Sequence, residues 1–329
     1  MRLRFSAVFI ALALALAALA AFSMCTGSLK LGFWEVLSVL SGMGGSETAS
    51  AAVFHIRLPR LAAGALVGAS LASAGAAMQS LFRNPLADPS ITGVSSGAAL
   101  GAALSVCVFS SALLPIQAGA MVFGIAAAAA IWRLGRINGR VSAFSMLLAG
   151  IAVNAFCGAL VGFAMYSARE AGLKGFIFWT LGSLDNCSWG GIALSAAISC
   201  AAWGVLMANA RGLNMLLLGR EGAYHSGADA DRLQFLAMFC AAALTAASVS
   251  ICGIIGFVGL VVPHMARLAS GPDNRRLLPL CALGGACLVT FSDLASRLLT
   301  PGDNVPIGVV TALIGAPFFM FLLRRARNA

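Results

Sequence analysis

The apolar run from Leu61 to Leu81 constrains the fold more than any other part of the chain. It holds no charged residue, it follows Arg57 and Arg60, and Arg83-Asn84-Pro85 closes it. A helix rises about 1.5 Å per residue, so roughly 20 apolar residues cross the hydrocarbon core of a bilayer. The stretch therefore predicts one membrane crossing between two charged ends.

The rest of the chain repeats this pattern. Hydrophobic residues make up 60% of the 329 residues and charged residues only 10%, which is typical of a protein with many membrane spans. We expect a single all-α domain over residues 1–329 with about ten spans, and a short further helix outside the membrane in 168–189. The predicted spans are 5–22, 61–81, 93–108, 114–134, 142–166, 190–209, 233–252, 254–267, 277–298 and 306–323.

Charge predicts the orientation of these spans, because Lys and Arg are retained on the cytoplasmic side of a membrane. With both termini in the cytoplasm, most of the 21 Lys and Arg residues fall in inner connections. The outer connections then hold Lys30, Arg57, Arg60, Arg169, Lys174 and Arg297. The net charge of +10 is spread over short loops, so it predicts no nucleic-acid interface.

No motif for covalent chemistry or nucleotide binding stands out in the sequence. It contains no GxxxxGK[ST] phosphate loop, no HExxH motif and no CxxC pair among its nine cysteines. We therefore expect a protein that is not an enzyme and binds no metal or cofactor. If it moves a solute uphill, another chain must supply the energy.

Glycines recur every fourth residue within several spans, as in Gly64 and Gly68 or Gly158 and Gly162. This spacing lets helix backbones approach closely in lipid. It fits helix packing within one subunit, and no single pair requires a dimer.

Four long motifs, in order, carry a family resemblance. They are Arg57-Leu58-Pro59-Arg60, the run from Asn84 to Pro89, GFVGLVVPHMARL from Gly256, and VPIGVVTALIGAPFF from Val305. Together they resemble the FecCD/BtuC family of ABC-importer permeases, which carry iron-siderophores, haem and cobalamin.

The resemblance implies a BtuC-like, type II importer fold in the bacterial cytoplasmic (inner) membrane. It also implies a homodimer, or a pair with a similar permease, bound to two cytoplasmic ABC ATPase subunits. A periplasmic or lipid-anchored binding protein would deliver the substrate. ATP would be bound and hydrolysed by the partner ATPase, and this chain would need no cofactor.

The resemblance also assigns residues to two partner surfaces. Arg57, Arg60 and Arg297 would dock the binding protein from a cationic patch that faces the periplasm; alternatively they are span-end anchors whose charges snorkel to the interface. The connection 211–232 would be the coupling segment for the ATPase, and without the resemblance it would be an ordinary surface loop. Its matching residues are Leu218, Gly219, Glu221, Ala223 and Gly227.

A cytoplasmic gate is implied by the hairpin after the run to Leu81. Asn84 and Leu86 match positions that narrow the cytoplasmic mouth of the pathway, and Ser142 and Ser145 match a second constriction. The fifth and tenth spans would line the pore. From the residues alone, Asn84-Pro85 is equally well a structural turn, because a residue before proline avoids the helical conformation.

The substrate expected first is an iron chelate, a siderophore or haem, with cobalamin as the alternative. A rival class is an ion-coupled secondary transporter, which would need ionisable residues inside the membrane. Asp293 is the one carboxylate within a predicted span, near its outer end.

Overall fold

The computed structural model describes residues 5–27, 29, 31–44, 46–109, 115–137, 140–299 and 305–327. Within these ranges the regular elements are helices, apart from one short antiparallel hairpin in which Arg136 pairs with Val141 and Ile137 with Arg140. The elements are α1 (Phe5–Cys25), α2 (Phe33–Leu40), α3 (Glu47–Ala51), η1 (Ala52–Arg57), α4 (Leu58–Leu81), η2 (Pro89–Thr92), α5 (Val94–Ala103), η3 (Leu104–Val108), α6 (Ile116–Leu134), β1 (Arg136–Ile137), β2 (Arg140–Val141), α7 (Ala143–Tyr166), α8 (Glu170–Thr180), α9 (Trp189–Ala208), α10 (Ala210–Leu216), α11 (Gly219–His225), α12 (Ala230–Cys252), α13 (Val258–Ser270), α14 (Asn274–Leu299) and α15 (Ile307–Arg327).

The multi-pass membrane architecture is confirmed. In the described part of the chain, 7 helices are long and apolar enough to cross a bilayer, and Val94–Val108 and Ile307–Phe321 are shorter apolar helices. Each predicted span contains a helix, but the number of ten crossings stays a prediction, since α13 has only 13 residues. The extra helix expected in 168–189 is present as α8.

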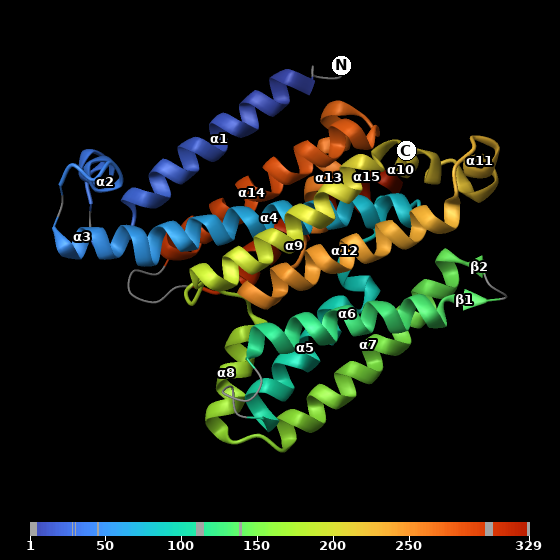
Figure 1. Ribbon diagram of the computed structural model, residues 1–329, viewed down its shortest axis with the longest axis horizontal. Helices are drawn as coiled ribbons and strands as arrows, with labels where there is room; N and C mark the ends of the chain where they lie inside the picture. The colour runs from blue at the N-terminus through green and yellow to red at the C-terminus, as the bar shows by residue number, and fades with distance from the viewer. Residues whose placement is uncertain are drawn as a thin grey trace.

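Helix α4 forms the centre of the bundle and packs against α9, α12, α13 and α14 (Figure 1). Its Ala, Gly and Ser residues allow this crowding. A Cβ added at Gly68 would lie 2.0 Å from the carbonyl oxygen of Gly285, and one at Gly75 would lie 1.9 Å from that of Gly259. Backbone therefore packs directly on backbone, which is the use of glycine that the spacing predicts.

The remaining long helices lie on two sides of this centre. Helix α1 packs along α14, whereas α5, α6 and α7 pack together and contact the centre through α12 (Figure 1). Gly158 and Gly162 of α7 have open space around them in the single chain. This pair is thus not used for packing between described helices.

The two ends of the bundle differ in character. We call the end of α4 that carries Arg57 and Arg60 the outer end and the end that precedes Arg83 the inner end, following the orientation that charge predicts. The last turn of α1 and the last turn of α14 lie at the outer end, as the contacts of Arg57 and Arg297 show. Helices α10 and α11 lie at the inner end (Figure 1).

Candidate functional site

A cluster of opposite charges lies buried at the outer end. The Arg60 Nε donates to Asp293 Oδ1 at 2.6 Å, and its Nη1 donates to Asp185 in the loop between α8 and α9. The Arg297 Nη2 lies 3.0 Å from Asp293 Oδ2. Asp293 therefore bridges two arginines of different helices, and its charge is compensated although it is only 2% exposed.

The end of α1 and the residues after it are bonded to this cluster through main-chain carbonyl oxygens and one serine hydroxyl. Arg57 donates to the carbonyl oxygens of Met24 and Leu29. Arg297 donates through Nη1 to the carbonyl oxygen of Thr26 at 3.0 Å and through Nη2 to the Ser23 hydroxyl at 2.6 Å. The cluster thus joins α1, α4, α14 and the α8–α9 loop.

The prediction that these arginines face water is wrong. Arg57 is 6% exposed and Arg60 is 7% exposed. The helix begins earlier than predicted, at Glu47, and runs as one 35-residue stretch to Leu81. Both arginines consequently lie within it, beneath the end of α1, instead of at its solvent-facing start. Their role in docking stays a prediction.

Cys187 lies close enough to the cluster to be affected by its charges. Burial, the main cause, raises the pKa of its thiol to about 12, with Asp293 and Asp185 raising it and Arg60 lowering it. The thiol is accordingly protonated at neutral pH and a poor nucleophile.

The predicted coupling segment folds into two short helices, α10 and α11, at the inner end. Gly219 and Ala223 are buried, whereas Leu218 is 67% exposed and Glu221 is also exposed. Gly227 takes a positive φ of 76° just after α11, and the Ala228 N–H donates to the Ala223 carbonyl oxygen at 2.9 Å. This is a Schellman-type C-cap, which explains a glycine at that position.

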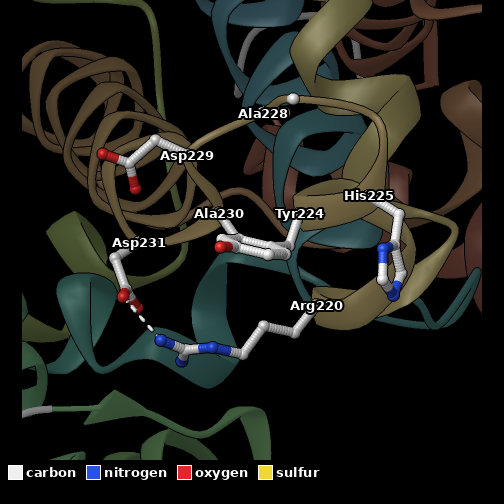
Figure 2. Close-up of a pocket in the computed structure, with 8 residues that line it drawn as sticks. Arg220, Tyr224, His225, Ala228, Asp229, Ala230 and Asp231 are labelled. Atoms are coloured by element: carbon white, nitrogen blue, oxygen red, sulfur yellow. Dashed lines mark hydrogen bonds and ion pairs between the residues drawn. The ribbon is translucent and has the colours of Figure 1, made fainter.

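A pocket of about 770 Å³ lies between α11 and the start of α12. Figure 2 shows Arg220 extended toward Asp231, to which its Nη2 is bonded at 2.6 Å, with the Tyr224 ring beside them. Asp229 and His225 also line the pocket, and the Asp229 side chain caps α12 by accepting from the Arg232 N–H. Charges of both signs beside an exposed aromatic ring suit a protein partner.

The hairpin after α4 is a defined turn. Asn84 Oδ1 accepts from the Leu86 N–H at 2.9 Å, and Arg83 takes the left-handed conformation with φ of 52°. Asn84 is exposed and Leu86 is half-buried. This geometry is that of a structural turn, and it is equally compatible with a role in a cytoplasmic gate.

The second predicted constriction lies at the start of α7. Ser142 is exposed and Ser145 is half-buried, directly after the hairpin of β1 and β2. Helix α7 contacts η2, which follows the Asn84 hairpin. The segment that follows the Asn84 hairpin thus contacts the same helix that begins just after Ser142.

Two sets of contacts were not predicted from the sequence. Asp185, the second carboxylate on Arg60, lies in a loop and has no periodic or motif signal. Asn214 bonds to Asp273 and Asn274 across 59 and 60 positions of sequence, and only the fold brings these three together. Burial works to raise the pKa of Asp273, but hydrogen bonds from Arg275 and Asn214 outweigh it, so this pKa lies below its ordinary value.

Known proteins resemble this chain over nearly its whole length. The model of the FecCD transport family matches residues 14–325. The chain is 42% identical to the cobalamin import system permease protein BtuC of Halobacterium salinarum, over 88% of this chain and 79% of that protein. It is 37% identical to the hemin transport system permease protein HmuU of Yersinia pestis, over 91% of this chain and 96% of that protein.

A solved structure agrees with these sequence matches. It is that of a metal-chelate type ABC transporter in an inward-facing conformation, with a TM-score of 0.85 and 31% sequence identity. The similarity covers 98% of this chain and 99% of the other. The matched family consists of membrane permeases, the transmembrane components of ABC importers, which do not themselves hydrolyse ATP. The resemblance seen in the sequence motifs is confirmed, and this chain belongs to the FecCD transport family.

Proposed function

We propose that this chain is the permease subunit of an importer that carries an iron chelate, a siderophore or haem, into the cytoplasm. The observation that carries the proposal is the family match over residues 14–325 together with the 37% identity to a hemin permease over nearly its full length. ATP is hydrolysed by a separate subunit. Both termini lie in the cytoplasm of a bacterial cell, and the spans cross its inner membrane.

Two copies of the chain, or this chain and a similar permease, enclose the pathway, with α7 and α15 lining it. Their surfaces support this arrangement, because α7 exposes large apolar side chains and leaves Gly158 and Gly162 open for a close neighbour. Substrate passes through the cavity between the two copies. Asn84, Leu86, Ser142 and Ser145 narrow its cytoplasmic mouth.

The ATPase binds α10 and α11, the helices that contain the predicted coupling residues. Leu218 and Tyr224 are 67% and 78% exposed, although both are large and apolar over most of their surface. Burying such side chains in a partner stabilises a complex, and the pocket beside Arg220 and Asp231 offers polar partners at its rim. Glu221, exposed between them in sequence, adds a charge to the same surface.

The binding protein docks at the outer end, around Arg57, Arg60 and Arg297. In the single chain these arginines are held by internal partners, and Asp185, with its side chain 39% exposed, is more accessible than Asp293, the other carboxylate bound to Arg60. Carboxylates on the binding protein would compete with Asp185 for Arg60. Such charge pairs set orientation and association rate more than affinity.

Cobalamin is the second candidate substrate. It is favoured by the 42% identity to a cobalamin permease over 88% of this chain. Haem and cobalamin are both large metal chelates, so one wide pathway suits either.

The substrate is tested with the binding protein encoded nearest to this chain. Purified binding protein is titrated with haem, a ferric siderophore and cobalamin, and its binding to the permease complex is measured by size exclusion. Submicromolar affinity for an iron chelate, with cobalamin not bound, supports the proposal. If the binding protein binds cobalamin and neither iron chelate, cobalamin becomes the proposed substrate. A binding protein that binds none of the three chelates contradicts the proposed function.

A further inference from the structure

We propose that Asn214 is the positioning residue that transmits movement of α10 and α11 to the inner ends of α4 and α14. The inference rests on the proposed function, in which these two short helices receive the ATPase. It adds the route by which their movement would reach the hairpin at Asn84.

The Asn214 amide is fully used between two helices. Its Nδ2 donates to Asp273 Oδ1 at 2.7 Å, and its Oδ1 accepts from the backbone N–H and from the side-chain Nδ2 of Asn274, each at 2.8 Å. If this amide were rotated by half a turn, its oxygen would face the Asp273 carboxylate, which is also an acceptor, and its NH2 group would face the two N–H donors of Asn274. The hydrogen-bond pattern thus fixes its orientation.

Both residues that Asn214 contacts start α14. The backbone carbonyl oxygen of Asp273 accepts from the Leu277 N–H at 2.9 Å, and its carboxylate accepts from the Arg275 N–H at 3.1 Å. Asp273 consequently caps the first turn of α14. A displacement of Asn214 therefore acts on the end of a helix that runs 26 residues to the charge cluster at the outer end.

The same contacts continue to α4. The Ser80 hydroxyl lies 3.3 Å from Asn274 Oδ1 and 3.0 Å from the Ala76 carbonyl oxygen, so its one proton is shared between these two acceptors. Ser80 and Asn274 are both completely buried. Ser80 lies in the last turn of α4, four residues before Asn84. One chain of hydrogen bonds therefore leads from α10 through the start of α14 to the helix that carries the predicted gate.

A second contact reinforces this route. Gly219, at the turn between α10 and α11, has a φ of 90°, and a Cβ added there would lie 3.0 Å from the Arg83 Nη1. The turn thus lies against the residue before Asn84. Leu213 and Leu216 anchor α10 in the hydrophobic core at 1% and 4% exposure, so α10 cannot slide freely over its neighbours.

Burial makes these hydrogen bonds hard to replace. Removing the Asn214 amide leaves the Asn274 side chain and an ionised Asp273 without a shared partner, and water has little access to Asn274. The short helices then lose their polar attachment to α14 and α4 while keeping their apolar anchors. Movement of α10 and α11 is no longer passed on in full.

The test compares Asn214→Ala with Asn209→Ala in the complete transporter in proteoliposomes. Asn209 is a matched control, because it directly follows α9 and its amide donates to the Val205 carbonyl oxygen of that helix at 2.8 Å. Both ATP hydrolysis and substrate uptake are measured, and the readout is substrate carried per ATP hydrolysed. A defect in folding lowers both activities together, whereas a defect in transmission lowers their ratio.

We expect Asn214→Ala to keep hydrolysis within about twofold of wild type and to lower the ratio by about tenfold, within the usual range of coupling between sites. Asn209→Ala should leave the ratio unchanged. Ser80→Ala removes the hydroxyl's contact with Asn274 and its bond to the Ala76 carbonyl oxygen within α4. It should lower the ratio by a smaller factor, and it serves as the test if Asn214→Ala does not fold.

Two results would overturn the inference. One is an unchanged ratio of substrate carried to ATP hydrolysed in folded Asn214→Ala, or in Ser80→Ala where Asn214→Ala does not fold. The other is loss of ATPase binding by a folded Asn214 variant. Failure of the wild-type chain to copurify with an ATPase would instead contradict the proposed function, so the two failures are distinguishable.

Discussion

Replacing Arg60 by alanine should strongly destabilise the protein. The side chain is buried and bonds to Asp293, which is also buried. Removing one partner of a buried ion pair costs about 3–5 kcal/mol, because the other charge is left uncompensated. Asp293 keeps Arg297 at 3.0 Å, so we expect the lower end of this range, about 3 kcal/mol.

The assay is denaturant-induced unfolding in detergent, followed by tryptophan fluorescence. Lys174→Ala is the matched control, since its ion pair with Glu170 is solvent-exposed, with side chains 69% and 80% accessible. Exposed pairs of this spacing contribute about 0.5 kcal/mol or less. Asp293→Ala should cost more than Arg60→Ala, because it leaves two buried guanidinium groups without their shared carboxylate.

A loss below about 1 kcal/mol for Arg60→Ala, or a loss equal to that of Lys174→Ala, would refute the reasoning. The predicted loss of stability also affects how docking experiments on Arg60 variants are interpreted. Charge reversal at Arg60 would unfold part of the outer end and reduce docking indirectly. Asp185→Asn, at the accessible edge of the cluster, is the cleaner variant for measuring affinity for the binding protein.

Three further predictions concern packing, reactivity and partner binding. Gly75→Ala should lower the free energy of unfolding by about 1–3 kcal/mol, because the added Cβ would clash with the backbone of Gly259. Gly158→Ala adds a Cβ in open space and should lower the free energy of unfolding by less than about 0.5 kcal/mol, so equal losses in the two variants would contradict the packing. In a variant that retains only Cys187, alkylation by a membrane-impermeant maleimide should be slow at pH 7 and still accelerate above pH 9, since the thiol pKa is raised to about 12; a rate that levels off near pH 9 would contradict this. Leu218→Asp should reduce copurification of the ATPase at least about tenfold, in line with loss of a hot-spot residue, and unchanged copurification would remove Leu218 from that surface.

The long helices could be predicted because a run of apolar residues within the segment itself favours a membrane-spanning helix. Long apolar runs between charged or turn-forming residues predicted the long helices, and a short helix was also expected where α8 lies, whereas α2 and α3 were not predicted. The approach of Gly68 to Gly285 was only half predictable, because the spacing identifies one glycine face but does not name its partner. Helix ends were less certain, and the early start at Glu47 placed Arg57 and Arg60 inside the fold.

The surroundings of the candidate site could not be predicted from the sequence. Arg60 and Asp293 are 233 positions apart, and nothing in either segment shows that they meet. The buried position of Arg57 depends on where the end of α1 lies, which local hydropathy does not encode. For the same reason, the segment 211–232 was predicted to be a cytoplasmic surface element, but its attachment to α14 through Asn214 became visible only in the fold.

A measurement of which energy source drives uptake tests most directly the central claim, that this chain is the permease of an ATP-driven importer. Proteoliposomes that contain this chain, its ATPase and its binding protein are loaded with ATP, and uptake of labelled chelate is measured. We predict uptake only when all three proteins and hydrolysable ATP are present. Uptake by this chain alone, driven by a proton or sodium gradient, would contradict the account.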